Sequence, residues 1–227
     1  SEMCIRDRGH VVLVGSILTG ERGFNWLATF LEDYYIAQPT VLAILFLFLV
    51  HAVFAARKIP AQLAERKRLA ELAGGLRNSG REKVETRTAH SPFRPHVESM
   101  LWIWQVRTGF IILVLGSFHL VLIAIDIFTP LFGSIAGIES VSSMARVQAG
   151  LWLPYAILLL CVEFHASVGL YRLVIKWGAD LWLSRAVLHR IEQVIFWIVL
   201  GLGTLTLVVL AGWLEPPLAF LLEGGAS

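Results

Sequence analysis

Four histidines and one glutamate fall within apolar stretches of the sequence, where an ionisable side chain is costly to bury. His51, His119 and His165 lie inside long apolar runs, and His10 lies in a shorter one. Glu163 precedes His165 by two residues in the same run. One such histidine can be satisfied by a hydrogen bond to a neighbouring helix. Four of them together indicate a shared chemical purpose.

The distance of each histidine from the charged end of its run gives its depth in a membrane. His51 lies six residues before Arg57, and His165 lies seven residues before Arg172. At a rise of 1.5 Å per residue, each is about 10 Å inside the face to which these cations belong. We therefore predict that His51 and His165 form a matched inner pair.

The other two histidines lie nearer the opposite face. His119 precedes Asp126 by seven residues, which places it about 10 Å below that face. His10 precedes Glu21 by about ten residues and also lies toward the outer side. His10 and His119 are therefore predicted to form an outer pair.

Two histidines that face each other from different helices at one depth suit the axial positions of a haem iron. Such ligation leaves no open position for oxygen and favours electron transfer. A zinc site is the weaker interpretation, because its usual four-coordinate geometry needs further ligands. Arg172 and Lys176 follow His165 where the propionates of an inner haem would point, although ordinary snorkelling explains such cations equally well.

The elements that must position these residues are membrane helices. The chain has 227 residues, 56% of them hydrophobic and only 16% charged, which excludes a soluble domain of this size. About 20 apolar residues are needed to cross a bilayer as a helix. Runs of that order extend from Pro39 to Ala56, Met100 to Ile125, Leu151 to Ile175 and Val194 to Trp213.

A fifth apolar run, residues 9–19, has about half the length needed to cross a bilayer and follows a polar octet. We expect the amino terminus, residues 1–8, to be truncated or incorrect, and the octet lacks the features of a secretory signal. The expected fold class is therefore all-α: a transmembrane bundle of five helices, the first truncated, that encloses two b haems. Its membrane domain is expected over residues 9–214, with a short outer-side tail at 215–227.

The distribution of lysine and arginine predicts the orientation. Ten of the 19 cations lie between Arg57 and Arg94, and four lie between Arg172 and Arg190. The positive-inside rule places both segments in the cytoplasm. In the loop 59–98 we expect a short helix that Gly74 and the residues after it break, followed by a flexible link; a docking surface for a soluble partner is the alternative.

Smaller features carry structural expectations. Cys4 and Cys161 cannot form a CxxC site, and Cys161 is expected to be a buried, inert thiol. Gly201 and Gly203 are expected to permit close helix packing rather than to mark a cofactor site.

Four motifs carry a resemblance to a known family: VEFHASVGLYRLVIKWG, LGSFHL, HAVFAARKIP and GHVVLVGSILTG. They resemble the dihaem cytochrome b subunit of bacterial menaquinol:fumarate reductases, which belong to the succinate:quinone oxidoreductases. The resemblance covers residues 9–210 and implies five helices in the bacterial inner membrane. It also implies two b haems, a proximal one held by His51 and His165 and a distal one held by His10 and His119.

The resemblance implies roles for two carboxylates. Glu32 matches a position that accepts a proton when menaquinol is oxidised, although a solvated loop residue would look the same. Glu163 matches a family glutamate that is implicated in proton movement across the membrane. The alternative interpretation is that Glu163 is a protonated acid that is hydrogen-bonded within the bundle. Glu163 lies about 200° around the helix from His165 and does not share its face. Arg146 lies close to a family arginine, but its spacing to His165 is shifted by one residue, and it receives no role.

The implied function is a membrane anchor that oxidises menaquinol near the outer face and releases protons through Glu32. Electrons would pass through the distal and then the proximal haem to an iron–sulfur subunit, with a flavoprotein subunit, on the cytoplasmic side. The chain has no cysteine cluster and no flavin motif, so fumarate chemistry belongs to other subunits.

Other interpretations stay open at this point. The same subunit serves a succinate dehydrogenase that reduces menaquinone, and a haem-free structural anchor or the cytochrome b subunit of a hydrogenase or formate dehydrogenase would be built similarly. We expect membrane lipid but no nucleic acid as a partner, and a dimer of the complex is left open.

Overall fold

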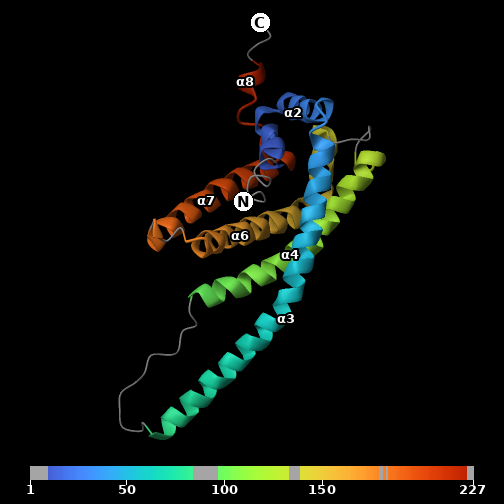
Figure 1. Cartoon of the computed structure of the whole chain (residues 1–227). Helices are drawn as coiled ribbons and strands as arrows, with labels where there is room; N and C mark the ends of the chain where they lie inside the picture. The colour runs from blue at the N-terminus through green and yellow to red at the C-terminus, as the bar shows by residue number, and fades with distance from the viewer. Residues whose placement is uncertain (1–9, 84–96, 133–138, 179–180, 183, 224–227) are drawn as a thin grey trace. The chain divides into compact units, whose positions relative to one another are not determined.

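The computed structural model describes residues 10–83, 97–132, 139–178, 181–182 and 184–223. In this part of the chain every regular element is a helix (Figure 1). Among the described residues, four helices are long and apolar enough to cross a membrane, and a shorter apolar helix precedes them. The spans are Pro39–Leu69, Met100–Asp126, Ser140–Lys176 and Arg185–Leu210, and the shorter helix is His10–Thr19. The predicted all-α, multi-pass architecture is confirmed.

The chain divides into two units, which are described separately. One unit is Val41–Met100, and it consists mainly of the long helix α3, Ala37–Lys83. The apolar run from Pro39 to Ala56 lies within α3, which continues through Pro60 into the charged segment. The proline removes only one main-chain hydrogen bond, and helix formers follow it.

The predicted break at Gly74, Gly75 and residues 78–80 was wrong, because α3 runs to Lys83. Each glycine costs a helix only about 1 kcal/mol relative to alanine, and neighbouring helix formers offset that cost. Gly74 and Gly75 are exposed, and a Cβ at either would meet no atom within 4 Å. The expected flexible link at residues 84–96 lies outside the described residues, as do Cys4 and the octet at residues 1–8.

The other unit, Ser1–Thr40 with Leu101–Ser227, contains most of α4 (Val97–Phe128) together with α6 (Trp152–Lys176) and α7 (Arg185–Leu210). Helices α6 and α7 lie side by side (Figure 1). A Cβ at Gly203 of α7 would lie 2.6 Å from Leu159 Cδ1, so this glycine does permit close packing. Gly201 has no such neighbour within 4 Å, and the same prediction was wrong for it.

Two helix boundaries differ from those expected. Helix α7 begins nine residues earlier than predicted, because the Ser184 hydroxyl accepts a hydrogen bond of 3.4 Å from Val187 N–H and caps the first turn. Helix α6 is preceded by α5, Ser140–Arg146, and by a π-helical turn, Val147–Leu151. Gly150 has φ +100° in that turn, a conformation that glycine adopts without a Cβ penalty.

Short elements pack together at one end of this unit. They are η1 (Ser16–Thr19), α2 (Glu21–Asp33), α5 and α8 (Phe220–Glu223). The predicted tail returns to the bundle here, since Leu218 N–H donates to the Leu18 carbonyl at 2.9 Å. The buried apolar cluster of the unit lies at this end and contains Ile17, Leu18, Phe24, Ala28, Val147, Val209 and Leu210.

Candidate haem-binding histidines

His165 of α6 is held by the main chain of α4. Its Nδ1 lies 2.8 Å from the carbonyl oxygen of Gln105. A carbonyl oxygen only accepts hydrogen bonds, so Nδ1 carries the proton and the lone pair of the neutral ring is on Nε2. An Nδ1–H bond to a backbone carbonyl is a usual way to fix the tautomer of a metal-ligating histidine. In this tautomer the lone pair on Nε2 is the kind of donor that a haem iron requires.

Close approach of α4 and α6 makes this contact possible. A Cβ at Gly109 of α4 would lie 2.9 Å from Cε1 and 3.2 Å from Nδ1 of the His165 ring. Such distances are too short for a real side chain, so the imidazole occupies space that only glycine leaves open. Gly109 is a positioning residue that sequence reasoning missed.

The side chain of Gln105 also reaches α6. Its Oε1 accepts a hydrogen bond of 2.8 Å from Arg172 Nη1, and its Nε2 would lie 3.0 Å from a Cβ at Gly169. Gln105 therefore contacts α6 over two helical turns, through its carbonyl at His165 and through its amide at Arg172. An amide within an apolar run was the available sequence signal, since polar side chains in membrane helices usually hydrogen-bond across a helix interface.

His51 lies on α3 and is exposed within its own unit. It forms an interaction, and its pairing with His165 stays a prediction. Lys176 is an exposed residue of the last turn of α6, one turn beyond Arg172.

His10 and His119 are brought together. Their ring centroids are 6.1 Å apart and their planes are inclined by 67°. Neutral imidazoles are standard ligands of a haem iron, and two that approach each other in an apolar region could hold one haem together. His119 Nδ1 is also buried and has no hydrogen-bond partner among the described residues. The donor set thus suits a haem.

Tyr155 of α6 completes this outer pair. Its ring contacts that of His119 edge to face, with centroids 5.3 Å apart. The Tyr155 hydroxyl is buried, and the described residues supply it with no hydrogen bond of acceptable geometry. His119 Nδ1 and the Tyr155 hydroxyl are thus two buried polar atoms on adjacent rings inside the bundle.

A buried ion pair, Asp126–Arg146, lies beside the outer pair and was missed by sequence reasoning. Asp126 is 1% exposed and Arg146 is 4% exposed. Arg146 Nη2 also donates to Ser143 Oγ at 3.0 Å, and Asp126 Oδ1 accepts from Phe132 N–H at 3.2 Å. The pair joins the end of α4 to α5, and both charges are satisfied.

The ion pair shares a helix face with a predicted ligand. Asp126 follows His119 by seven residues, two turns of α4, so both lie on nearly the same face. The Arg146 charge is within electrostatic reach of His119 and of Tyr155. The signal in the sequence was a pair of opposite charges at the facing ends of two apolar runs, 20 residues apart.

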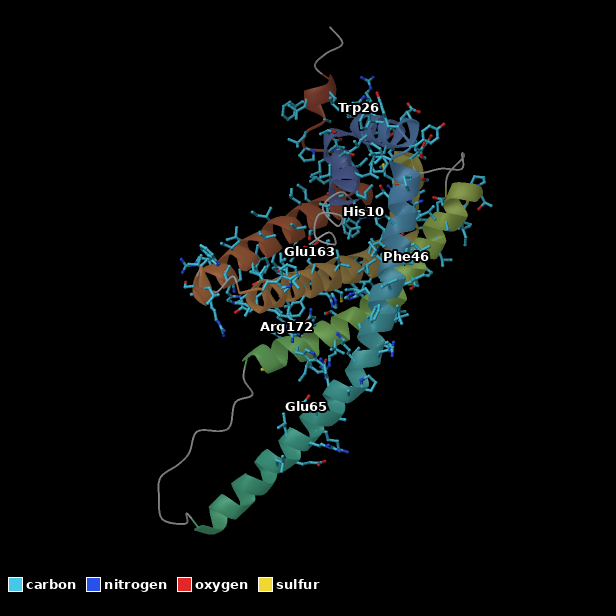
Figure 2. The ribbon with its side chains drawn as sticks, in the orientation of Figure 1. His10, Trp26, Phe46, Glu65, Glu163 and Arg172 are labelled. Carbon is cyan, nitrogen blue, oxygen red and sulfur yellow. The ribbon has the colours of Figure 1, made fainter. Side chains whose placement is uncertain are left out.

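The two predicted carboxylates occupy different surroundings. Glu32 is exposed in the last turn of α2. Glu163 is partly buried and lies on the side of α6 next to α7, whereas Arg172 lies on the side next to α4 (Figure 2). Glu163 forms an interaction of its own, and its part in proton movement stays a prediction. Cys161 is buried and free, as expected.

Fold and site together define a multi-pass membrane protein whose apolar helices carry histidines in contact across helix interfaces. Residues 81–211 match the family described as the succinate dehydrogenase/fumarate reductase transmembrane subunit. The fumarate reductase cytochrome b subunit of Wolinella succinogenes is 32% identical over 86% of this chain and 72% of its own length. That of Helicobacter pylori strain 26695 is 30% identical over 86% and 71%. The chain belongs to this family of succinate dehydrogenase and fumarate reductase membrane subunits.

Proposed function

We propose that this chain is the quinol-oxidising cytochrome b subunit of a fumarate reductase and holds two b haems. The observation that carries the proposal is the approach of the His10 and His119 rings, whose centroids are 6.1 Å apart, since two such imidazoles would together hold one haem. The names of the relatives, each a fumarate reductase cytochrome b subunit, support the same assignment.

Haem b between two imidazoles supplies a one-electron carrier with no open position for oxygen. His10 and His119 would hold the outer haem, and His51 and His165 the inner one. The Gln105 carbonyl keeps the proton of His165 on Nδ1, so that Nε2 presents its lone pair. Arg172, held by Gln105, and Lys176 would place positive charge at the inner end of α6.

Protons are assigned to the two carboxylates. Glu32 is exposed at the end of the bundle that holds α2, where a carboxylate can accept a proton from quinol and release it to water. Glu163 lies on the face of α6 opposite His165 and would carry protons without contacting the haem ligand. The iron–sulfur and flavoprotein subunits would dock on the cytoplasmic side, in the bacterial inner membrane, and menaquinol is the proposed substrate. Succinate oxidation with menaquinone reduction uses the same residues.

A pyridine haemochrome assay on the purified full chain tests the proposal. Two haems per chain are expected, and a chain without haem would refute it. In the variant His165→Ala the inner haem should be lost and the outer kept, because the two ligand pairs are on different helices. In His119→Ala the outer haem should be lost instead.

A matched control is His189→Ala. His189 lies on α7, where its ring contacts Glu192 at 2.9 Å and Tyr171, and it belongs to neither predicted ligand pair. This variant should keep both haems. If His189→Ala and His165→Ala lose haem equally, the loss would report damage to the bundle, and the assigned ligand pairs would be wrong.

A further inference from the structure

Helix α2 carries a row of exposed aromatic side chains, here termed the aromatic ladder: Trp26, Phe30 and Tyr34, which follows the helix directly. Their side chains are 68%, 39% and 68% exposed. Residues four apart lie on one side of a helix, and the rings contact in sequence. The centroids of Trp26 and Phe30 are 5.8 Å apart, and those of Phe30 and Tyr34 are 4.8 Å apart. Three large apolar rings are thus arranged in order on an exposed surface.

Other contacts of α2 fix the direction in which the aromatic ladder points. Phe24 and Ala28 are buried against the cluster that contains Ile17 and Leu18. Asn25 Oδ1 accepts a hydrogen bond of 2.9 Å from Ser140 N–H, at the start of α5. The helix therefore cannot roll to bury the ladder without losing this core and this hydrogen bond.

The position of α2 in the chain places it at a membrane boundary. It has 13 residues, about 20 Å of helix, which is too short to cross a hydrocarbon core of about 30 Å. It follows the apolar helix His10–Thr19 and precedes the membrane span that begins at Pro39. Both ends of α2 are thereby held close to the level at which membrane helices meet water.

The side chains around α2 divide into two arcs. At 100° per residue, the ladder, Leu27, Leu31 and the buried Phe24 and Ala28 occupy one continuous apolar arc. The polar residues Glu21, Arg22, Asn25, Thr29, Glu32 and Asp33 occupy the remainder. This division is typical of a helix that lies in the plane of a membrane interface.

We propose that α2 is an interfacial helix and that its aromatic ladder inserts at the headgroup and upper acyl level of the leaflet at this end of the bundle. The partner is lipid. Tryptophan and tyrosine favour this level because each combines an apolar ring with a polar group. The consequence is a fixed depth for the polar arc, which keeps the Glu32 carboxyl on the aqueous side. This inference does not depend on haem binding.

Tryptophan fluorescence of the full chain in lipid nanodiscs tests the proposal. Nanodiscs made with phosphatidylcholine brominated near the headgroup are compared with unbrominated ones, and the signal of Trp26 is obtained as the difference between the wild type and Trp26→Phe. The Trp26 emission should be lost in brominated nanodiscs and should resist acrylamide added to the water.

The matched control moves the indole to the polar arc at the same level, in the double variant Trp26→Phe/Thr29→Trp. Thr29 is exposed, so the new tryptophan should keep its emission in brominated lipid and lose it to acrylamide. Acrylamide quenching of Trp26 itself would overturn the proposal. Protection of Trp26 from both quenchers would also overturn it, because the ladder would then be covered by protein, such as a second copy of the chain.

Discussion

The variant Asp126→Asn removes one charge from the buried ion pair and should lower the free energy of unfolding strongly. Both partners are almost fully buried, so neither charge can regain its hydration in the folded protein. Asparagine keeps an oxygen that can accept the hydrogen bond from Phe132 N–H, so the change in stability reports the loss of the charge rather than the loss of this hydrogen bond. Removal of one partner from a buried pair typically costs about 3–5 kcal/mol, because the other charge is left uncompensated.

A double-mutant cycle measures this coupling. Asp126→Asn, Arg146→Gln and the double variant are unfolded with guanidinium in one detergent and followed by far-UV circular dichroism. Each single variant should lose about 3–5 kcal/mol, and the double variant should lose far less than the sum, because a neutral pair leaves no buried charge. The exposed carboxylate Glu21 supplies the control, and Glu21→Gln should change stability by less than about 0.5 kcal/mol.

Two outcomes would refute this reasoning. If the losses of the two single variants add in the double variant, the charges do not interact and the ion pair is not what joins α4 to α5. If Asp126→Asn is no more destabilising than Glu21→Gln, the pair is hydrated in the membrane domain rather than buried.

Two further predictions concern glycines. Gly203→Ala should destabilise the contact of α6 and α7 by about 1–3 kcal/mol, since its Cβ would lie 2.6 Å from Leu159 Cδ1. The control Gly201→Ala, on the same helix, should leave stability unchanged or raise it slightly. Thermal unfolding of both variants measures this, and equal effects would contradict the packing. Gly109→Ala should displace the His165 ring. We therefore expect the electron paramagnetic resonance signal of one low-spin haem to shift while the signal of the second haem keeps its position. An unchanged spectrum would show that the position of the ring does not depend on this glycine.

Much of the architecture could be predicted from the sequence because it follows from composition along the chain. A bilayer requires about 20 apolar residues per crossing, so the four spans were visible as apolar runs. Counting residues from each histidine to the charged end of its run predicted that His10 and His119 lie toward the same face, and their ring centroids are 6.1 Å apart. These are properties of a linear sequence read against the thickness of a membrane.

Local signals were less reliable at the ends of helices. Gly74 and Gly75 predicted a break in α3, but each glycine weakens a helix by only about 1 kcal/mol and the surrounding helix formers prevail. Helix α7 begins earlier than its apolar run, because the Ser184 side chain caps the first turn with a hydrogen bond. The length of a helix depends on the sum of small free-energy contributions from many residues. A single residue of low helix propensity therefore does not decide where the helix ends.

The contacts between helices were decided only by the tertiary structure. The carbonyl of Gln105 orients His165, Gly109 leaves room for the ring, and Asp126 pairs with Arg146 across 20 residues. None of these follows from the type of residue, because each depends on which faces of two helices meet and how closely. The sequence by itself determined which side chains must be satisfied inside the membrane. The fold determined their partners, since hydrogen bonds and ion pairs require separations of a few ångströms that only helix packing sets.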